Sequence, residues 1–388
     1  MDDILLNLES LADEMPEVPA YAATLPRMRD FLPWHRPRKQ YVRKYQWCEE
    51  IWRMLDDSPL TDGTLKYMGL PGVDLLDLRY FHNAICETRN IKLRFLGFIE
   101  SAKPTNDAQT EFNVSLDEVR RLPRVDPMSH VIGDDFALVA KEDSFAFRKA
   151  RELGPFDVIN LDLCDGFGAQ APGGLDQTYY DAVNSLLTLQ SRYKNPWLLL
   201  LTTRADRANV NPEVLQKLLD KYINNLTNSA PFREASLESF DIGTKDALCA
   251  AANTAEGLLA VFLTGLCKWF LGLALKQRPP TAVKLLSVIG YRVKVDAEHE
   301  DLISLALRFK PTHLPPSDPL GLASHQGVAP DEYQLATSAL KQVAKREDAD
   351  KRLIDDAGLN QEMIDATSSL LGLARYDVDA YRAWVQQV

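Results

Sequence analysis

The sequence predicts an α/β protein built on a doubly wound, mainly parallel sheet of seven strands that ends in an antiparallel hairpin. Strand-like apolar runs alternate with helical patterns from residue 64 to residue 204, which is typical of parallel strands joined by right-handed crossovers. Residues 156–163 are too apolar for a half-exposed strand, so this strand should lie inside the sheet with helices on both faces. Two further strands, 282–293 and 301–309, are joined by a connection too short for a crossover helix and should pair antiparallel.

Five strand and helix units precede this hairpin. The expected strands are residues 64–74, 92–100, 129–135, 156–163 and 196–204, and the expected helices are residues 75–88, 144–152, 179–193 and one that begins near residue 115. Ser115, with Glu118 three residues later, predicts a capping box at the start of the helix near residue 115. The first expected strand ends in a turn that contains Gly69, Pro71 and Gly72.

Three segments are expected along the chain of 388 residues. Residues 1–60 form an N-terminal helical arm, residues 61–314 form the α/β domain, and residues 315–388 form a helical C-terminal region that begins with a Pro- and Gly-bearing linker. A larger helical connection, about residues 206–278, interrupts the α/β domain. The C-terminal helices are expected to serve in packing, or in contact with a protein partner or a second copy of the chain.

The end of the fourth expected strand is the most informative motif of the chain. The apolar run of residues 156–163 contains Asp162 as its second-last residue and is followed by Asp165, Gly166 and Gly168. Open α/β sheets bind ligands outside the carboxyl ends of their strands, and glycines there give the backbone freedom to approach a ligand. The motif therefore predicts a ligand site, with a plain acidic turn as the alternative.

The composition is that of a soluble globular protein. With 44 basic and 55 acidic residues, the formal charge of −11 disfavours unspecific attraction to nucleic acid or to an anionic membrane. Five cysteines without a Cys-x-x-Cys pair, and histidines without metal-ligand spacing, argue against a disulfide framework and against a metal site. The N-terminus lacks a signal pattern, so a cytoplasmic protein is expected.

Residues 257–275 are apolar enough to be compared with a membrane span. Lys268 lies at the middle of this segment, where a charge is costly in lipid, so a buried core helix and no membrane contact are expected. A stripe of small residues would let the helix approach a neighbour closely, and that neighbour could be a second subunit. The stripe comprises Gly257, Ala260, Thr264, Gly265 and Gly272.

Over roughly residues 64–310, the order of these elements resembles the class I S-adenosylmethionine-dependent methyltransferase fold, in which a seven-stranded sheet ends in such a hairpin. The resemblance implies a divergent member with S-adenosylmethionine as its cofactor. Gly69 and Gly72 occupy the place of the glycine-rich turn that approaches the cofactor's amino-acid portion, and Asp74 follows them. The chain departs from the family because Pro71 stands between its glycines and because the acid comes after the turn.

The resemblance also implies roles for the acids at the later strand ends. Glu100 would accept hydrogen bonds from the ribose hydroxyls, and Asp134 and Asp135 would lie near the adenine amino group. Asp162 and Asp165 would position the methyl acceptor, and either could act as the base. Taken alone, each acid could equally be a solvated loop carboxylate or a helix cap. The sequence lacks the Asn/Asp-Pro-Pro-aromatic motif of amino-directed DNA methyltransferases and the Pro-Cys pair of cytosine-C5 enzymes, so the acceptor stays open.

The N-terminal arm carries a second cluster that the acidic composition does not predict. Its basic residues include Arg36, Arg38, Lys39, Arg43 and Lys44. Aromatic residues are interleaved with them: Phe31, Trp34, Tyr41, Tyr45 and Trp47. Such a mixture can hold phosphates and stack on bases, so nucleic acid is a candidate partner. The alternative is an arm whose aromatic residues pack on the α/β domain while its basic residues pair with acids.

Two functions of different classes are consistent with these features. The first is a cytoplasmic methyltransferase that binds S-adenosylmethionine and acts on an unidentified acceptor, which could be a nucleic acid. The second is a non-catalytic scaffold of the same fold that holds a nucleic acid or a protein partner. The carboxylates at successive strand ends favour the first, and the irregular turn around Pro71 favours the second.

Overall fold

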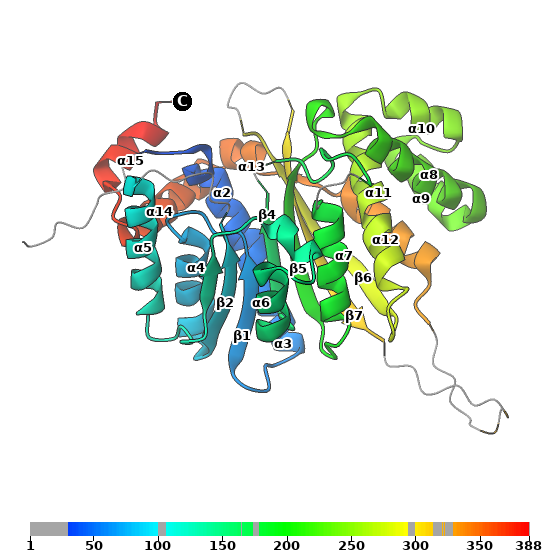
Figure 1. Cartoon of the computed structure of the whole chain (residues 1–388). Coiled ribbons are helices and arrows are strands. Elements are labelled where there is room, and N and C mark those ends of the chain that lie inside the picture. The colour runs from blue at the N-terminus through cyan, green and yellow to red at the C-terminus, as the bar shows by residue number, and fades with distance from the viewer. Residues whose placement is uncertain are drawn as a thin grey trace, which may run out of the picture.

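The computed structural model describes residues 30–99, 106–163, 165–173, 178–293, 299–312, 320, 322 and 329–387. These residues form an α/β structure in which helices flank a mostly parallel eight-stranded sheet (Figure 1). The strands are β1 (Thr64–Gly69), β2 (Lys92–Phe98), β3 (His130–Ile132), β4 (Val158–Asp162), β5 (Trp197–Arg204), β6 (Thr281–Tyr291), β7 (Leu302–Pro311) and β8 (Glu347–Asp348). The expected α/β class is confirmed.

The sheet has the strand order β3-β2-β1-β4-β5-β7-β6-β8. Strands β1 to β5 run parallel to one another, and β7 pairs antiparallel with both β5 and β6. The expected antiparallel pair is therefore present, although β7 lies between β5 and β6. The eighth strand, β8, was not predicted; it has two residues and pairs parallel with β6 at the edge of the sheet. Two residues are too few to produce an apolar run or an alternating pattern.

Helices cover both faces of the sheet. In chain order they are α2 (Pro37–Val42), α3 (Glu49–Asp57), α4 (Leu76–Phe81), α5 (Asn106–Arg120), α6 (Phe145–Leu153), α7 (Tyr179–Gln190), α8 (Pro212–Asn228), α9 (Ala230–Phe240), α10 (Lys245–Ala251), α11 (Ala255–Ala274), α12 (Glu332–Ala344), α13 (Ala349–Asp355), α14 (Ala357–Leu373) and α15 (Val378–Val385). Along β5, Trp197, Leu199 and Leu201 pack into one core with α6, α7 and α11. Leu198 and Leu200 pack into the opposite core with α2, α3 and α4. This alternation explains why the strand is apolar at every position.

The helix before β3 begins earlier than the sequence predicts. Helix α5 starts at Asn106, so Ser115 lies inside the helix and the expected capping box at Ser115 is wrong. Ser115 is fully buried, and its Oγ accepts a hydrogen bond from Arg375 at 3.2 Å. Glu118 accepts hydrogen bonds from Arg79 and Arg375 instead of closing a cap. The capping pattern was misleading because these two residues bind distant arginines.

From residue 30, where its described part begins, the N-terminal arm is part of the α/β structure. Helix α2 continues into a π-helical stretch, Arg43–Cys48, and then into α3. Trp47 is completely buried, and its Nε1 donates a hydrogen bond to Ser304 Oγ on β7 at 3.1 Å. Gln46 Nε2 donates to the Ser304 carbonyl oxygen at 3.0 Å. The arm therefore forms one of the helical layers that cover the sheet.

The predicted helical connection between β5 and β6 contains helices α8 to α11. Within the described part of the chain, α11 is the one helix long and apolar enough to cross a membrane, and 78% of its most apolar stretch is buried inside the structure. Lys268 of α11 is also buried, where its Nζ lies 3.2 Å from a Glu332 carboxylate oxygen. Gly265 faces Leu218 of α8, so the small-residue stripe brings α11 close to a helix of the same chain.

We expect two glycines of α11 to respond oppositely to alanine. A Cβ at Gly265 would lie 2.7 Å from the Leu218 Cβ, so Gly265→Ala should lower the free energy of unfolding by about 1–3 kcal/mol through overpacking. A Cβ at Gly272 meets no atom within 4 Å, so Gly272→Ala should raise that free energy by about 0.5–1 kcal/mol. Urea unfolding measures both. Shifts of the same sign would contradict the packing of α11 on α8.

Candidate functional site: a cavity at the strand ends

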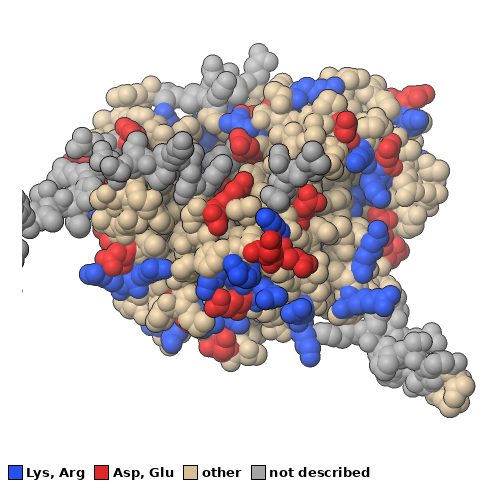
Figure 2. All heavy atoms as spheres, viewed as in Figure 1, with Lys and Arg blue, Asp and Glu red and all other residues tan. Residues whose placement is uncertain are grey.

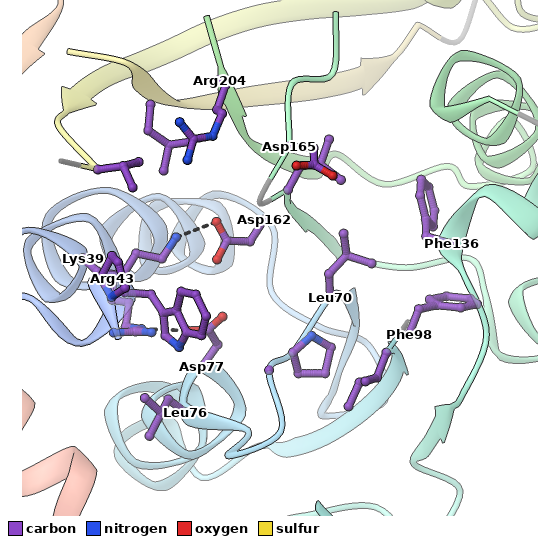
Figure 3. Close-up of a pocket in the computed structure, with 18 of the residues that line it drawn as sticks. Lys39, Arg43, Leu70, Leu76, Asp77, Phe98, Phe136, Asp162, Asp165 and Arg204 are labelled. Atoms are coloured by element: carbon purple, nitrogen blue, oxygen red, sulfur yellow. Dashed lines mark hydrogen bonds and ion pairs between the residues drawn. The ribbon is translucent and has the colours of Figure 1, made fainter. Parts of the chain in front are cut away.

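A cavity of about 410 Å³ opens at one edge of the sheet (Figure 3). Phe98, Asp162 and Arg204, the last residues of β2, β4 and β5, line it. Leu70, directly after β1, also lines it. Strands β1 and β4 are neighbours from which the strand order runs in opposite directions, and open α/β sheets bind ligands at such a switch point. The volume lies within the usual range of about 300–1,000 Å³ for small-molecule sites.

One end of the cavity is apolar. Leu70 and Pro71 follow β1, Phe98 and Ile99 lie at the end of β2, and Phe136 follows β3. The rings of Phe98 and Phe136 meet edge to face with centroids 5.9 Å apart. In Figure 3, Phe98 and Phe136 lie together on the opposite side of the view from Lys39 and Arg43. This end can hold a flat apolar group such as a purine.

The other end of the cavity contains ion pairs between the arm and the strand-end loops. Lys39 Nζ lies 2.5 Å from Asp162 Oδ1, and Arg43 Nε lies 2.6 Å from Asp77 Oδ1 (Figure 3). The Lys39 and Arg43 side chains are each only 3% exposed. Lys39 is also held over the ring of Trp47. Because unpaired buried charges are strongly destabilising, these pairs fix the arm against the cavity.

Asp74 lies in the loop after β1 and is hydrogen-bonded to two other parts of the chain. Its Oδ2 lies 3.2 Å from His35 Nε2 and accepts a hydrogen bond from the Tyr376 hydroxyl at 3.2 Å. His35 Nδ1 accepts from the Leu32 N–H, so Nε2 carries the proton that His35 donates to Asp74. Burial by itself would raise the pKa of Asp74, but the hydrogen bond from His35, the charge of Arg43 and the hydrogen bond from Tyr376 lower it overall.

The backbone next to Asp74 is strained. Leu75 has a left-handed conformation with φ of 54°, which a leucine rarely adopts. Its side chain is fully buried, and its N–H donates to the Gly72 carbonyl oxygen at 3.1 Å. Such strain persists only where the surroundings fix the backbone, and it is commonest at functional sites. The loop after β1 is therefore held in one shape by its neighbours.

The structure brings most of the predicted cofactor and catalytic residues together. Gly72, Asp74, Asp135, Asp162 and Asp165 line the cavity, whereas Gly69 and Asp134 are not part of the lining. Glu100 lies outside the described residues. The Asp135 side chain accepts a hydrogen bond from the Ala137 N–H at 2.8 Å, so it caps the short helix Phe136–Ala140 as well as facing the cavity.

Gly69 is required for a local reason. A Cβ at this position would lie 2.6 Å from the Tyr67 hydroxyl oxygen and against its ring. Tyr67 belongs to β1 and is almost completely buried. Gly69 thus makes room for a core tyrosine.

The five basic residues proposed for nucleic acid all have partners within the chain. Arg36 lies over the Trp384 ring at 3.7 Å, Arg38 pairs with Asp350 at 3.1 Å, Lys44 pairs with Glu362, and Lys39 and Arg43 form the pairs described above. On the face shown in Figure 2, Lys and Arg side chains are interspersed with Asp and Glu. The pairs that Arg38, Lys39, Arg43 and Lys44 form with acids agree with the alternative interpretation of the arm. Nucleic-acid binding stays a prediction.

Sequence reasoning missed several residues of this site. His35 and Tyr376, which hold Asp74, come from opposite ends of the chain, and no local pattern links them. Arg204 and Arg292 line the cavity at the ends of β5 and β6. Arg204 terminates the most strand-like run of the chain and lies at the same edge of the sheet as Asp162, a signal that could have identified it.

We expect Asp74→Asn to lower the free energy of unfolding at neutral pH, by about 1.5–3 kcal/mol for a buried charged hydrogen-bond acceptor. The pKa of Asp74 is lower in the folded state than its ordinary value of 3.8. The ionised carboxylate therefore stabilises the fold above pH 3.8, and this contribution is lost as the pH falls through the lower folded-state pKa.

Urea unfolding of the wild type and of Asp74→Asn at successively lower pH measures this effect. The difference between their free energies of unfolding should shrink below pH 3.8. Asp220→Asn, at an exposed position on α8, is the matched control and should change little. If the free energy of unfolding of the wild type exceeds that of Asp74→Asn by the same amount at every pH in this range, the Asp74 charge does not contribute to stability.

Comparison with known proteins gives a family for the chain. No curated protein matches the sequence. The model of the PP_RS20740-like family matches residues 28–386, which include the arm, the sheet and the C-terminal helices. The chain therefore belongs to the PP_RS20740-like family.

Proposed function

We propose that the cavity binds S-adenosylmethionine and that the protein is a methyltransferase. The observation that carries the proposal is a cavity at the switch point of the sheet with one apolar end and one charged end. The placement of β7 antiparallel beside β5, paired with β6, supports the resemblance to the class I methyltransferase fold.

The two ends of the cavity correspond to the two parts of this ligand. The side chains around Phe98 and Phe136 suit adenine, and the charged end suits an α-amino acid, which carries both an ammonium and a carboxylate. Among the described residues, the lining includes five aspartates and four lysine or arginine side chains. This slight negative excess suits a ligand whose sulfonium gives it a net positive charge.

Asp165 is the better candidate for accepting a proton from the methyl acceptor. Asp162 is already paired with Lys39, whereas no hydrogen bond or ion pair from a described residue to Asp165 is present and its side chain is exposed. When bound, the cofactor supplies the methyl group and its own leaving group. The chain's task is then to orient the acceptor and, for a weak nucleophile, to remove its proton. We assign orientation to Asp162 and proton removal to Asp165.

We expect purified protein to bind S-adenosylmethionine and S-adenosylhomocysteine in a calorimetric titration. Glu100 directly follows Ile99, which lines the cavity, and its carboxylate suits a ribose diol. Glu100→Ala should remove two charge-assisted hydrogen bonds, about 2–4 kcal/mol, and weaken binding roughly 30- to 700-fold.

Glu238→Ala, at an exposed position on α9, is the control and should bind as wild type does. If wild-type protein shows no heat of binding with either ligand at millimolar concentration, the proposed function is wrong.

We expect Asp165→Asn to reduce methyl transfer about 10²-fold or more with unchanged cofactor affinity, because the amide keeps the shape of the carboxylate but cannot take a proton. The assay supplies labelled S-adenosylmethionine to separate nucleic-acid, protein and small-molecule fractions of a cell extract, which also sorts the acceptor by class. Asp220→Asn is again the matched control.

Two results would separate catalysis from scaffolding. Wild-type transfer that survives in the Asp162→Asn and Asp165→Asn double variant would contradict the assigned roles. Cofactor binding without transfer to any fraction would instead favour a scaffold of this fold.

A further inference from the structure

We propose that Arg43 of the N-terminal arm binds the carboxylate of the ligand's amino-acid portion, and so selects adenosyl ligands that carry an intact α-amino acid. This inference rests on the proposed function, because it assigns one subsite of the same cavity. The family resemblance instead implies that the turn after β1 contacts this portion of the ligand.

Arg43 has hydrogen-bonding capacity that the described residues do not use. Its Nε donates to Asp77 at 2.6 Å, but its buried Nη1 has no acceptor among the described residues. The Arg43 side chain is 3% exposed and lines the cavity. A buried donor without an acceptor is costly, and a guanidinium presents its donors as a planar fork that matches a carboxylate. A carboxylate at this end of the cavity would satisfy that donor.

The charges around Arg43 keep it cationic and oriented. Burial alone would lower the pKa of Arg43, but the charge and hydrogen bond of Asp77, with the charges of Asp162 and Asp74, raise it overall. Asp77 holds the Nε edge of the guanidinium and thereby fixes its plane. The neighbouring cation, Lys39, is already paired with Asp162. Arg43 is paired as well, but unlike Lys39 it keeps a donor, Nη1, that has no acceptor among the described residues.

Backbone geometry also favours the arm over the turn after β1 as the source of this donor. Arg43 begins the π-helical stretch Arg43–Cys48, and such irregular helical turns are frequent at functional sites. Lys39 lies four residues earlier and so shares a helical face with Arg43. In the turn after β1, Pro71 has no backbone N–H to offer an anion. The arm supplies the cationic donor that this turn lacks.

The test compares two ligands that differ in the amino acid. S-adenosylhomocysteine carries an intact α-amino acid, and 5′-methylthioadenosine has the same nucleoside and thioether without it. Arg43→Lys keeps the positive charge beside Asp77 but loses the planar set of guanidinium donors. It should therefore lower the affinity for S-adenosylhomocysteine about 10- to 100-fold and change the affinity for 5′-methylthioadenosine by no more than about twofold.

Arg94→Lys is the matched control. Arg94 pairs with Asp126 at 2.8 Å, also has a buried nitrogen without a partner among the described residues, and does not line the cavity. This variant should leave both affinities unchanged. If Arg43→Lys does not fold, the double variant Arg43→Gln with Asp77→Asn removes both charges together and should show the same selective loss.

A ligand change in the wild-type protein tests the proposal without any substitution. Decarboxylated S-adenosylhomocysteine should bind about 10- to 100-fold more weakly than S-adenosylhomocysteine. Equal weakening of both ligands by Arg43→Lys, or equal wild-type affinity for the decarboxylated ligand, would overturn the role of Arg43. If wild-type protein binds none of these adenosyl compounds, the proposed function itself fails, which is a different result.

Discussion

The pairing of buried charges between the N-terminal arm and the strand-end loops is the constraint on which the cavity depends. Lys39 and Arg43 are almost completely buried, and Asp162 and Asp77 lie beside them and offset the cost of burying these two positive charges. Each pair joins two segments that the sheet alone would not hold together. The arm therefore does more than cover an apolar face, because its two cations form part of one wall of the cavity and supply two of the four Lys and Arg side chains among the described lining residues.

A second set of contacts ties the arm to the C-terminal helices. Asp74 receives hydrogen bonds from His35 and Tyr376, and the Tyr381 hydroxyl donates to the His35 carbonyl oxygen at 2.9 Å. Phe31 packs against Tyr376, Tyr381 and Trp384 in the same region. The loop after β1, with its left-handed Leu75, is thus fixed by residues from both ends of the family match. Asp74 thus connects the C-terminal helices directly to the lining of the cavity.

The sequence was informative wherever the deciding interactions are local. Apolar runs located the strands to within a few residues. Asp135, Asp162 and Asp165 lie together at the cavity because parallel strands bring their carboxyl ends to one edge, whereas Asp134 is not part of the lining and Glu100 lies outside the described residues. The arm could not be interpreted in this way. Basic and aromatic residues in alternation suit a nucleic acid and a packed helix equally, and the partners that occupy them, such as Asp350 and Glu362, lie some three hundred positions away. The capping box predicted at Ser115 was wrong for the same reason, because the partner of Ser115 is Arg375, which is distant in the sequence.

The contact between the two ends of the chain also bears on the order in which the site can form during synthesis. A ribosome releases the arm and strands β1 to β7 before helices α14 and α15, because the chain is synthesised from its N-terminus. The hydrogen bonds from Tyr376 to Asp74 and from Tyr381 to the His35 carbonyl oxygen can therefore form only after residues 376 and 381 have left the ribosome. The nascent sheet can assemble earlier, but the loop after β1 acquires its final partners only after residues 376 and 381 have been synthesised. The wall of the cavity at Asp74 is consequently completed only once the C-terminal helices have been made.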